Sequence, residues 1–132
     1  MPEFQNTQIM EHNLKPGLHL SDKYTVTEGD LASTIKTGDV HYASTPSLII
    51  LMEKVICKML IERLGDEYTT VSAEINVKHM LPLSKGENVN CSVHLKFVEE
   101  SKLFFDFVIF NSEEDIVAIG AHERVIVKKG DY

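Results

Sequence analysis

The sequence predicts an α+β domain in which an antiparallel sheet wraps around one long helix, with the elements in the order β-α-β-β-β-β. Apolar residues recur with helical spacing between residues 45 and 64, and the segments that follow alternate apolar and polar residues with a period of two. Short polar turns separate those segments, which favours a meander of neighbouring antiparallel strands.

The 132 residues fit one domain spanning residues 1–132, in which residues 1–16 form a loose N-terminal arm. Apolar residues make up 43% of the chain, which is enough for one packed core. The net charge of −7 argues against duplex nucleic acid as a partner, because binding to phosphates needs a basic face. A small anionic ligand needs only a few local cations and is compatible with this charge.

The first elements are a short strand and the long helix. Residues 23–27 predict the strand, and residues 28–42 read as an irregular connection. Ser44 or Thr45 can cap the helix that follows, Pro46 suits its first position, and Gly65 can end it at C′. The helix should therefore have about five turns.

Four strands are expected after Gly65. The first places Val71, Ala73, Ile75 and Val77 on one face, and the second does the same with Val89, Cys91, Val93, Leu95 and Phe97. The third, residues 103–110, is apolar on both faces, and the last covers residues 116–127. Because one helix can cover only one face of a sheet, the second apolar face predicts a homo-oligomer.

Two features predict a cytoplasmic protein without a membrane partner. Residues 1–10 lack the pattern of a signal peptide, and charged residues interrupt the most apolar segment, residues 48–64. The only cysteines, Cys57 and Cys91, are expected to be two buried free thiols rather than a disulfide.

Glu53 is the first candidate for chemistry. On a helical wheel it points away from the polar stripe and lies among Ile49, Ile56 and Leu60. A carboxylate there is either a functional group with a raised pKa or a residue at the edge of the core that reaches a backbone N–H or a water. Replacing it with Gln is expected to leave stability intact or to raise it.

His79 and Thr45 are the other candidates. His79 continues the apolar face of its strand, where a lone His is more often a satisfied core residue, but a second ionisable group aimed into the same core favours an acid–base pair with Glu53. Thr45 lies at the helix N-terminus, which could stabilise an oxyanion, although Thr is also an ordinary cap.

The remaining motifs are weaker. His122, Glu123 and Arg124 alternate in direction along one strand and cannot form a compact triad alone. The sequence has no zinc-ligand spacing, no Gly-rich phosphate loop and no nucleophile elbow. We therefore expect neither a metal nor a cofactor.

Three segments resemble the hotdog-fold thioesterases related to fluoroacetyl-CoA thioesterase. Residues 43–53, ASTPSLIILME, are similar to the start of the family's helix, which runs from a Thr to a Leu-Met-Glu. Residues 77–79, VKH, are similar to the Val-Xaa-His of the next strand, and residues 120–124, GAHER, to the family's Gly-Xaa-His-Glu-Arg. The resemblance covers roughly residues 17–128.

The resemblance implies a hotdog fold and hydrolysis of an acyl-CoA, with Thr45, Glu53 and His79 as the catalytic set. It implies that Arg124 and Ser72 bind substrate, and that CoA binds between the subunits of a homodimer or a dimer of dimers. It leaves open whether Glu53, Thr45 or an activated water attacks. The chain has no Phe between Leu31 and Tyr68, where the fluoroacetyl-specific enzyme has a gating Phe, and Ser72 falls where that enzyme has Gly. A general short- or medium-chain acyl-CoA is therefore the expected substrate.

Two other functions compete with hydrolysis. The first is a hotdog module that binds acyl-CoA without turning it over, and a thiol-release assay would separate it from an enzyme. The second is an enoyl-CoA hydratase, whose relatives have an Asp and a His a few residues apart near the helix. Asp39 and His41 lie too close together to match that spacing well.

Overall fold

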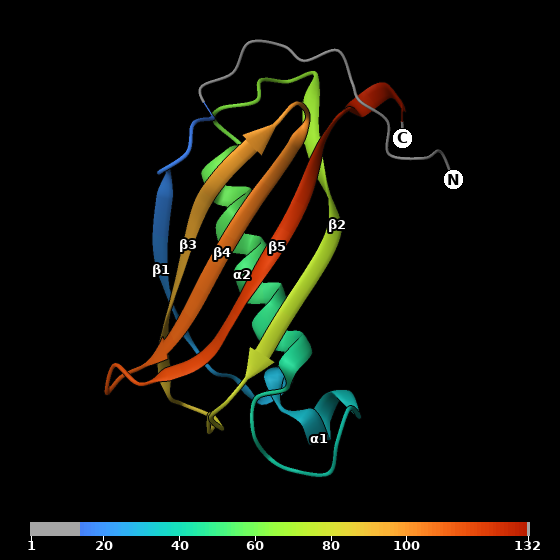
Figure 1. Cartoon of the computed structure of the whole chain (residues 1–132). Coiled ribbons are helices and arrows are strands. Elements are labelled where there is room, and N and C mark those ends of the chain that lie inside the picture. Colours follow the sequence, from blue (N-terminus) through green and yellow to red (C-terminus); the bar gives the residue numbers. More distant parts are fainter. Residues whose placement is uncertain (1–13, 132) are drawn as a thin grey trace.

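The computed structural model describes residues 14–131, and in it one helix lies against one face of a five-stranded antiparallel sheet (Figure 1). The strands are β1 (His19–Thr25), β2 (Tyr68–His79), β3 (Asn88–Glu99), β4 (Lys102–Asn111) and β5 (Ile116–Lys128), and the helices are α1 (Ala32–Ile35) and α2 (Thr45–Leu60). Two 3₁₀ turns, η1 (Glu28–Asp30) and η2 (Lys129–Asp131), complete the elements. The predicted α+β class and the order of the long helix and the strands are confirmed. The loose arm predicted for residues 1–16 lies almost wholly outside the described residues.

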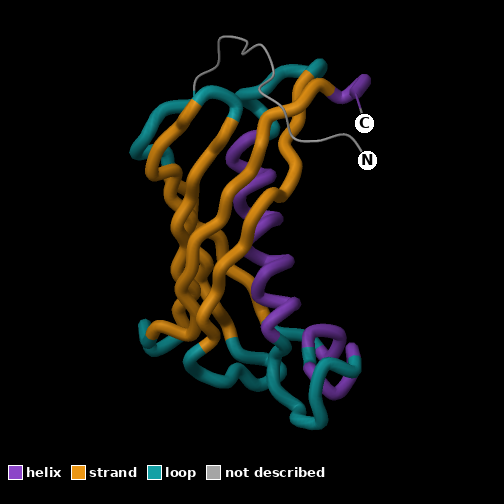
Figure 2. The backbone as a smooth tube through the Cα atoms, turned by 45° about the vertical axis from the view of Figure 1, so that its right-hand side comes forward, coloured by secondary structure: helices purple, strands orange, loops and turns teal. Residues whose placement is uncertain are grey.

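The strand order in the sheet is β1-β3-β4-β5-β2, so β1 and β2 form its two edges. Figure 2 shows the sheet curving around α2, with the helix lying along its concave side. The core lies between these two layers and includes Met52 and Ile56 of the helix and Phe105 and Phe107 of β4, each at most 1% exposed. Burying a side chain of this size contributes about 1.5–3 kcal/mol, which fixes the helix against the sheet.

The long helix begins where predicted but ends earlier. Ser44, not Thr45, is the N-cap, because its Oγ accepts the backbone N–H of Ser47 at 3.1 Å. The helix ends at Leu60 rather than next to Gly65. The chain tightens there, with the Arg63 N–H donating to the Leu60 carbonyl at 2.9 Å, and Gly65 takes a left-handed conformation only after this turn.

The first strand and the connection after it also differ from the prediction. β1 begins at His19 instead of residue 23, and the connection contains η1 and α1. As an edge strand, β1 alternates only between exposed and half-buried residues, and Asp22 occupies one of the half-buried positions. The period of two is therefore weak in the sequence.

A β-bulge in β2 changes which side chains face the helix. The pairing of β2 with β5 shifts between Ser72 and Glu74, so Ala73 is an extra residue. Before the bulge, Thr70 and Ser72 point to the helix side, and after it Ile75 and His79 do. The predicted alternation, which put Ala73 on the same face as Ile75, is therefore wrong before the bulge. An inserted residue reverses the phase of a strand.

A second bulge lies in β3, where the pairing with β4 shifts between Leu95 and Phe97. Phe97 was expected on the buried face with Leu95. It is instead 48% exposed and stacks on Phe104 of β4, with ring centroids 4.4 Å apart. The sheet face away from the helix therefore carries exposed aromatic surface.

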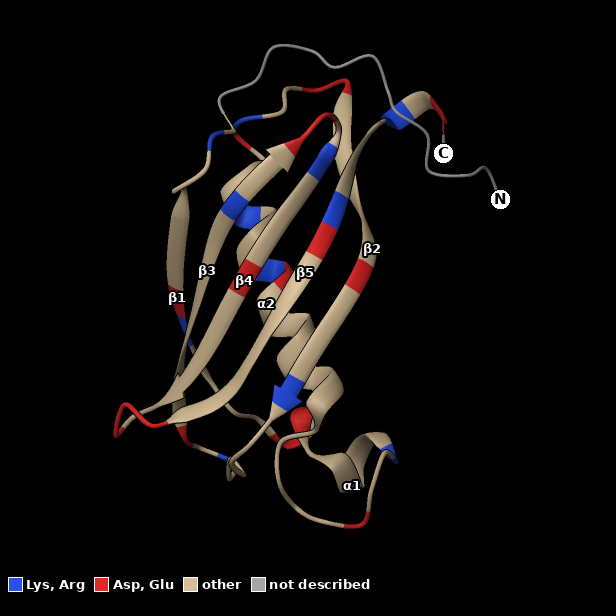
Figure 3. Ribbon diagram, in the orientation of Figure 1, with Lys and Arg blue, Asp and Glu red and all other residues tan. Residues whose placement is uncertain are grey.

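Charged residues of both signs lie along the central strands. Figure 3 shows Lys and Arg interspersed with Asp and Glu along β4 and β5. Within residues 14–131, no helix has the length and apolar character needed to cross a bilayer.

The two thiols are free, but only one of them is buried. Cys91 lies in the core, where burial raises the pKa of its thiol to about 12. Cys57 is exposed on α2, which corrects the expectation that both would be buried. It lies on the solvent side of the helix, one position past the buried Ile56.

Candidate active site

Thr45 and His79 are joined by a hydrogen bond of 2.9 Å between Thr45 Oγ1 and His79 Nδ1. The first turn of α2 supplies Thr45, and the last residue of β2 supplies His79. His79 Nε2 lies 2.8 Å from the Leu81 carbonyl, which can only accept, so the proton is on Nε2. Nδ1 then has a free lone pair, and Thr45 donates its hydroxyl proton to it. This is the arrangement of a hydroxyl nucleophile and its general base.

A pocket of about 440 Å³ opens beside this pair. Its wall combines Thr45 and His79 with the connection before α2 and the residues after β2. Several of these lining side chains are large, apolar and exposed: Val40, Tyr42, Met80 and Leu81. An apolar group can therefore be bound next to the Thr45 hydroxyl.

The backbone at the start of α2 is a poorer oxyanion site than expected. The Ser44 side chain accepts the Ser47 N–H, and the Ser44 carbonyl accepts the Leu48 N–H. Pro46 has no N–H to offer. The capping group thus occupies donors that a developing oxyanion would need. Because Ser44 is the cap, the Thr45 hydroxyl is free to pair with His79.

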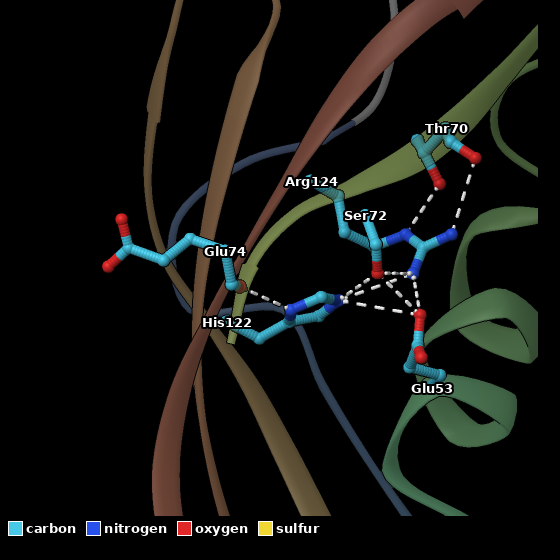
Figure 4. A network of polar contacts seen from close by, with 6 residues as sticks. All are labelled: Glu53, Thr70, Ser72, Glu74, His122 and Arg124. Carbon is cyan, nitrogen blue, oxygen red and sulfur yellow. Dashed lines mark hydrogen bonds and ion pairs between the residues drawn. The ribbon is translucent and has the colours of Figure 1, made fainter. Parts of the chain in front are cut away.

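Glu53 lies in a second polar cluster, shown in Figure 4. Its Oε2 accepts a hydrogen bond of 2.6 Å from Ser72 Oγ and one of 2.8 Å from Arg124 Nη1. Arg124 also donates to Thr70, through Nε to Oγ1 at 2.8 Å and through Nη2 to the carbonyl at 3.2 Å. The Arg124 side chain is 7% exposed and that of Glu53 is 31% exposed. The pair is an ion pair at the edge of the core.

The carboxyl of Glu53 is held in its charged form. Burial by itself raises its pKa, but the hydrogen bonds from Ser72 and Arg124 and the nearby charges lower the pKa below the usual value. The raised pKa that the sequence allowed for this carboxylate is therefore wrong. The sequence could not show that a buried cation would partner it.

His122 completes the cluster from the buried side. Its Nδ1 lies 2.7 Å from the Glu74 carbonyl, so Nδ1 carries the proton, and Nε2 accepts from Arg124 Nη1 at 3.2 Å. Burial lowers the pKa of His122, and the positive charge of Arg124 acts in the same direction. This His is therefore a neutral acceptor. In the sequence His122 is only a weak candidate, although its spacing from Arg124 places both residues on one face of β5.

The sequence-predicted residues therefore form two groups within one protomer. Thr45 and His79 make one, and Glu53, Ser72 and Arg124 make the other. Thr45 and Glu53 are on the same helix but about 12 Å apart along its axis. Both groups lie on the helix side of the sheet.

The rest of the described chain holds one similar pair, Ser33 Oγ and His41 Nδ1 at 2.8 Å, but it is exposed and does not line the pocket beside Thr45. A larger hollow of about 940 Å³ lies near the ends of β1, β3 and β4, and none of the predicted site residues line it. Within residues 14–131, His, Cys, Asp and Glu do not gather in threes as they would around a metal ion.

A curved antiparallel sheet around one long helix is the hotdog fold, and comparison with solved structures confirms it. A hot-dog-like protein from Thermanaerovibrio acidaminovorans has 20% identity and a TM-score of 0.80, over 87% of this chain and 84% of that one. A thioesterase superfamily member from Thermus thermophilus has 19% identity and a TM-score of 0.81, over 88% and 85% of the two chains. A point mutant of the fluoroacetyl-CoA-specific thioesterase has 16% identity and a TM-score of 0.84, over 92% and 93%.

The chain belongs to the fluoroacetyl-CoA-specific thioesterase family, whose model matches residues 26–130. The family resemblance seen in the sequence is thereby confirmed. No curated protein sequence matches the chain significantly.

Proposed function

We propose that the protein is an acyl-CoA thioesterase that hydrolyses a short- or medium-chain acyl-CoA to the free acid and CoA. The observation that carries the proposal is the 2.9 Å hydrogen bond from Thr45 to His79, in a pocket with an apolar wall. Membership of the family supports the reaction class. One similar structure, of the fluoroacetyl-CoA-specific thioesterase, contains fluoroacetate and CoA, which supports CoA as the carrier.

In the proposed reaction Thr45 Oγ1 attacks the thioester carbonyl carbon while its proton moves to His79 Nδ1. The C–S bond then breaks, and CoA leaves with the proton from His79. Water hydrolyses the acyl-threonine ester, with Glu53 as the base that takes the water's proton. The ester bond to Thr45 Oγ1 then breaks, the free acid is released, and the proton that Glu53 took from water passes to Thr45 Oγ1.

Glu53 is too far from Thr45 to act on the same carbon within one protomer, so we propose that a homodimer completes the site. β2 is a 12-residue edge strand, and its outer N–H and C=O groups can pair with another strand. Antiparallel pairing of two β2 strands centred on Asn76, with Ala73 as the extra residue of the bulge, would set His79 of one protomer opposite Ser72 of the other. Glu53 would then approach the Thr45–His79 pair of its partner.

Light scattering at micromolar concentration tests the assembly. A dimer or a dimer of dimers is expected, and a monomer would contradict the proposal. A mixing experiment tests the shared site. Thr45→Ala and Glu53→Gln subunits should each have little activity alone, but a mixed dimer keeps one intact site and should regain part of the activity. If each site lies within one protomer, mixing restores nothing.

A thiol-release assay over acyl-CoA substrates of increasing chain length tests the reaction itself. Glu53→Gln and His79→Ala should each lower turnover about a hundredfold or more, the usual range for losing an acid–base group. Binding of a non-hydrolysable acyl-CoA analogue should change much less. His94→Ala is a matched control, because His94 is an exposed residue that pairs with Asp106 on β4.

The alternative of a non-catalytic acyl-CoA-binding module makes a different prediction. The wild-type protein would bind the analogue, release no thiol from any substrate, and bind equally well after Glu53→Gln. We also propose a cytoplasmic location, which cell fractionation would test.

A further inference from the structure

Glu53 is anchored by only one of its two carboxylate oxygens. Oε2 receives both short hydrogen bonds, from Ser72 and from Arg124, and lies 3.9 Å from His122 Nε2. Among the described residues, no hydrogen bond reaches Oε1. Because the side chain is 31% exposed, Oε1 is the oxygen that remains for water or a ligand.

The direction of the hydrogen bonds at Ser72 follows from its neighbours. Arg124 Nη1, 3.3 Å from Ser72 Oγ, can only donate, and the ionised Glu53 Oε2 can only accept. The single hydroxyl proton of Ser72 therefore points to Glu53, and its lone pairs face Arg124. A ligand would have to break both contacts to use this hydroxyl.

The bulge in β2 allows Ser72 to contact Glu53 while His79, on the same strand, also faces the helix. Ser72 and His79 are separated by an odd number of positions, so a regular strand would put them on opposite faces. The extra residue Ala73 brings both to the helix side. The His122 Nδ1–H donates to the Glu74 carbonyl at this bulge, at 2.7 Å, which fixes the distorted backbone.

We infer that Ser72 is a positioning residue, which acts through Glu53 and with Arg124 fixes Oε2 so that Oε1 is presented as the base. This inference rests on the proposed function and assigns a role to Ser72 other than contact with substrate. Two donors on one oxygen also fix the rotation of the carboxylate, because Arg124 is itself held by Thr70. Losing the Ser72 hydroxyl would leave Arg124 as the only anchor.

A pair of variants of equal shape tests the role of the hydroxyl. Ser72→Thr keeps it and Ser72→Val removes it, and both suit a strand. In Ser72→Val, kcat should fall about tenfold or more with little change in KM, since misplacing a catalytic group by about 1 Å can cost a hundredfold. The acidic limb of the pH profile of kcat should move to higher pH, because a hydrogen bond to the charged carboxylate is lost.

Ser72→Thr should stay close to wild type. Ser92→Ala is the control, because it also removes a strand hydroxyl that makes a hydrogen bond. The partner of Ser92 is the Ser21 hydroxyl, on an exposed part of the sheet. A raised KM with unchanged kcat in Ser72→Val would make Ser72 a substrate contact and overturn the inference. An unchanged kcat and pH profile would overturn it as well.

A titration that does not depend on turnover separates this inference from the proposed function. The ¹³C resonance of the Glu53 carboxyl should titrate at higher pH in Ser72→Val than in Ser72→Thr. If wild-type protein releases no thiol, the proposed function fails, and the role of Ser72 in positioning a catalytic base fails with it. If thiol is released but the two variants titrate alike, only the role of Ser72 fails. Ser72→Ala replaces Ser72→Val should the latter not fold.

Discussion

Replacing Glu53 with Gln should destabilise the protein, contrary to what the sequence suggests. From the sequence, the change removes a charge from an apolar face and should be neutral or stabilising. In the structure, the carboxylate is the charged acceptor for Arg124, at 2.8 Å, and Arg124 is 7% exposed. Taking it away leaves a buried guanidinium without its counter-ion.

The magnitude follows from the exposure of the two partners. Removing one partner of a fully buried ion pair costs about 3–5 kcal/mol. Glu53 is 31% exposed, so water can approach the site, and the amide oxygen of Gln can still accept one hydrogen bond. We therefore expect a loss of about 1–2 kcal/mol in the free energy of unfolding, the range of a single hydrogen bond to a charged group.

Urea denaturation at pH 7 measures this difference. Glu62→Gln is the matched control, because Glu62 is exposed just beyond the end of α2, and its effect should stay within about 0.5 kcal/mol. Arg124→Met and the double variant complete a cycle that isolates the coupling between the two charges. A Glu53→Gln protein at least as stable as wild type, or a coupling energy near zero, would refute the reasoning.

Three further predictions concern the surroundings of the site. Burial holds the pKa of His122 below 6.5, so on acidification the unfolded chain takes up this proton before the folded protein does, and the free energy of unfolding should fall as the pH drops below 6.5. When the urea midpoint is plotted against pH, His122→Asn should flatten this part of the curve. Ser44→Ala should cost about 1 kcal/mol as a lost cap, whereas Thr45→Ala should unfold at nearly the wild-type urea concentration while turnover falls. A Cβ at Gly120 would collide with the Asn76 carbonyl, so Gly120→Ala should reduce the free energy of unfolding by more than about 2 kcal/mol. Thermal denaturation should show this loss as a markedly lower midpoint.

The elements that the sequence predicts correctly are those in which a hydrophobic period persists over several turns or residues. The apolar spacing of α2 and the alternation in β3, β4 and β5 are set by burial against one core, so the order of elements could be predicted. The end of the helix could not, because Gly65 is compatible with stopping the helix directly or after one more turn. β1 was misplaced since an edge strand that carries Asp22 at a half-buried position has little hydrophobic contrast.

The site shows the same division. The sequence correctly predicts that Thr45 lies at the start of the helix and that His79 faces the core side of its strand, because both are local properties. Their catalytic role stays a prediction. The partner of Glu53 was missed because it is fixed by an ion pair across 71 positions of the sequence. The sequence also fails to predict that Ser72 faces the helix. A bulge of one residue cannot be recognised from the alternation of apolar and polar residues until the pairing register of the strand is known.

The ion pair of Glu53 and Arg124 is hard to explain as a device for stability. Desolvating two charges offsets most of their attraction, and apolar residues of similar volume often stabilise a protein as well or better. Ser72 and Thr70 of β2 and Arg124 of β5 are also engaged, directly or through one another, in satisfying a single carboxylate oxygen of α2. A core position filled by Leu or Met would need none of them. An arrangement that stabilises little, but fixes the rotation and the charge of one half-exposed carboxylate, is the kind that a reacting group requires.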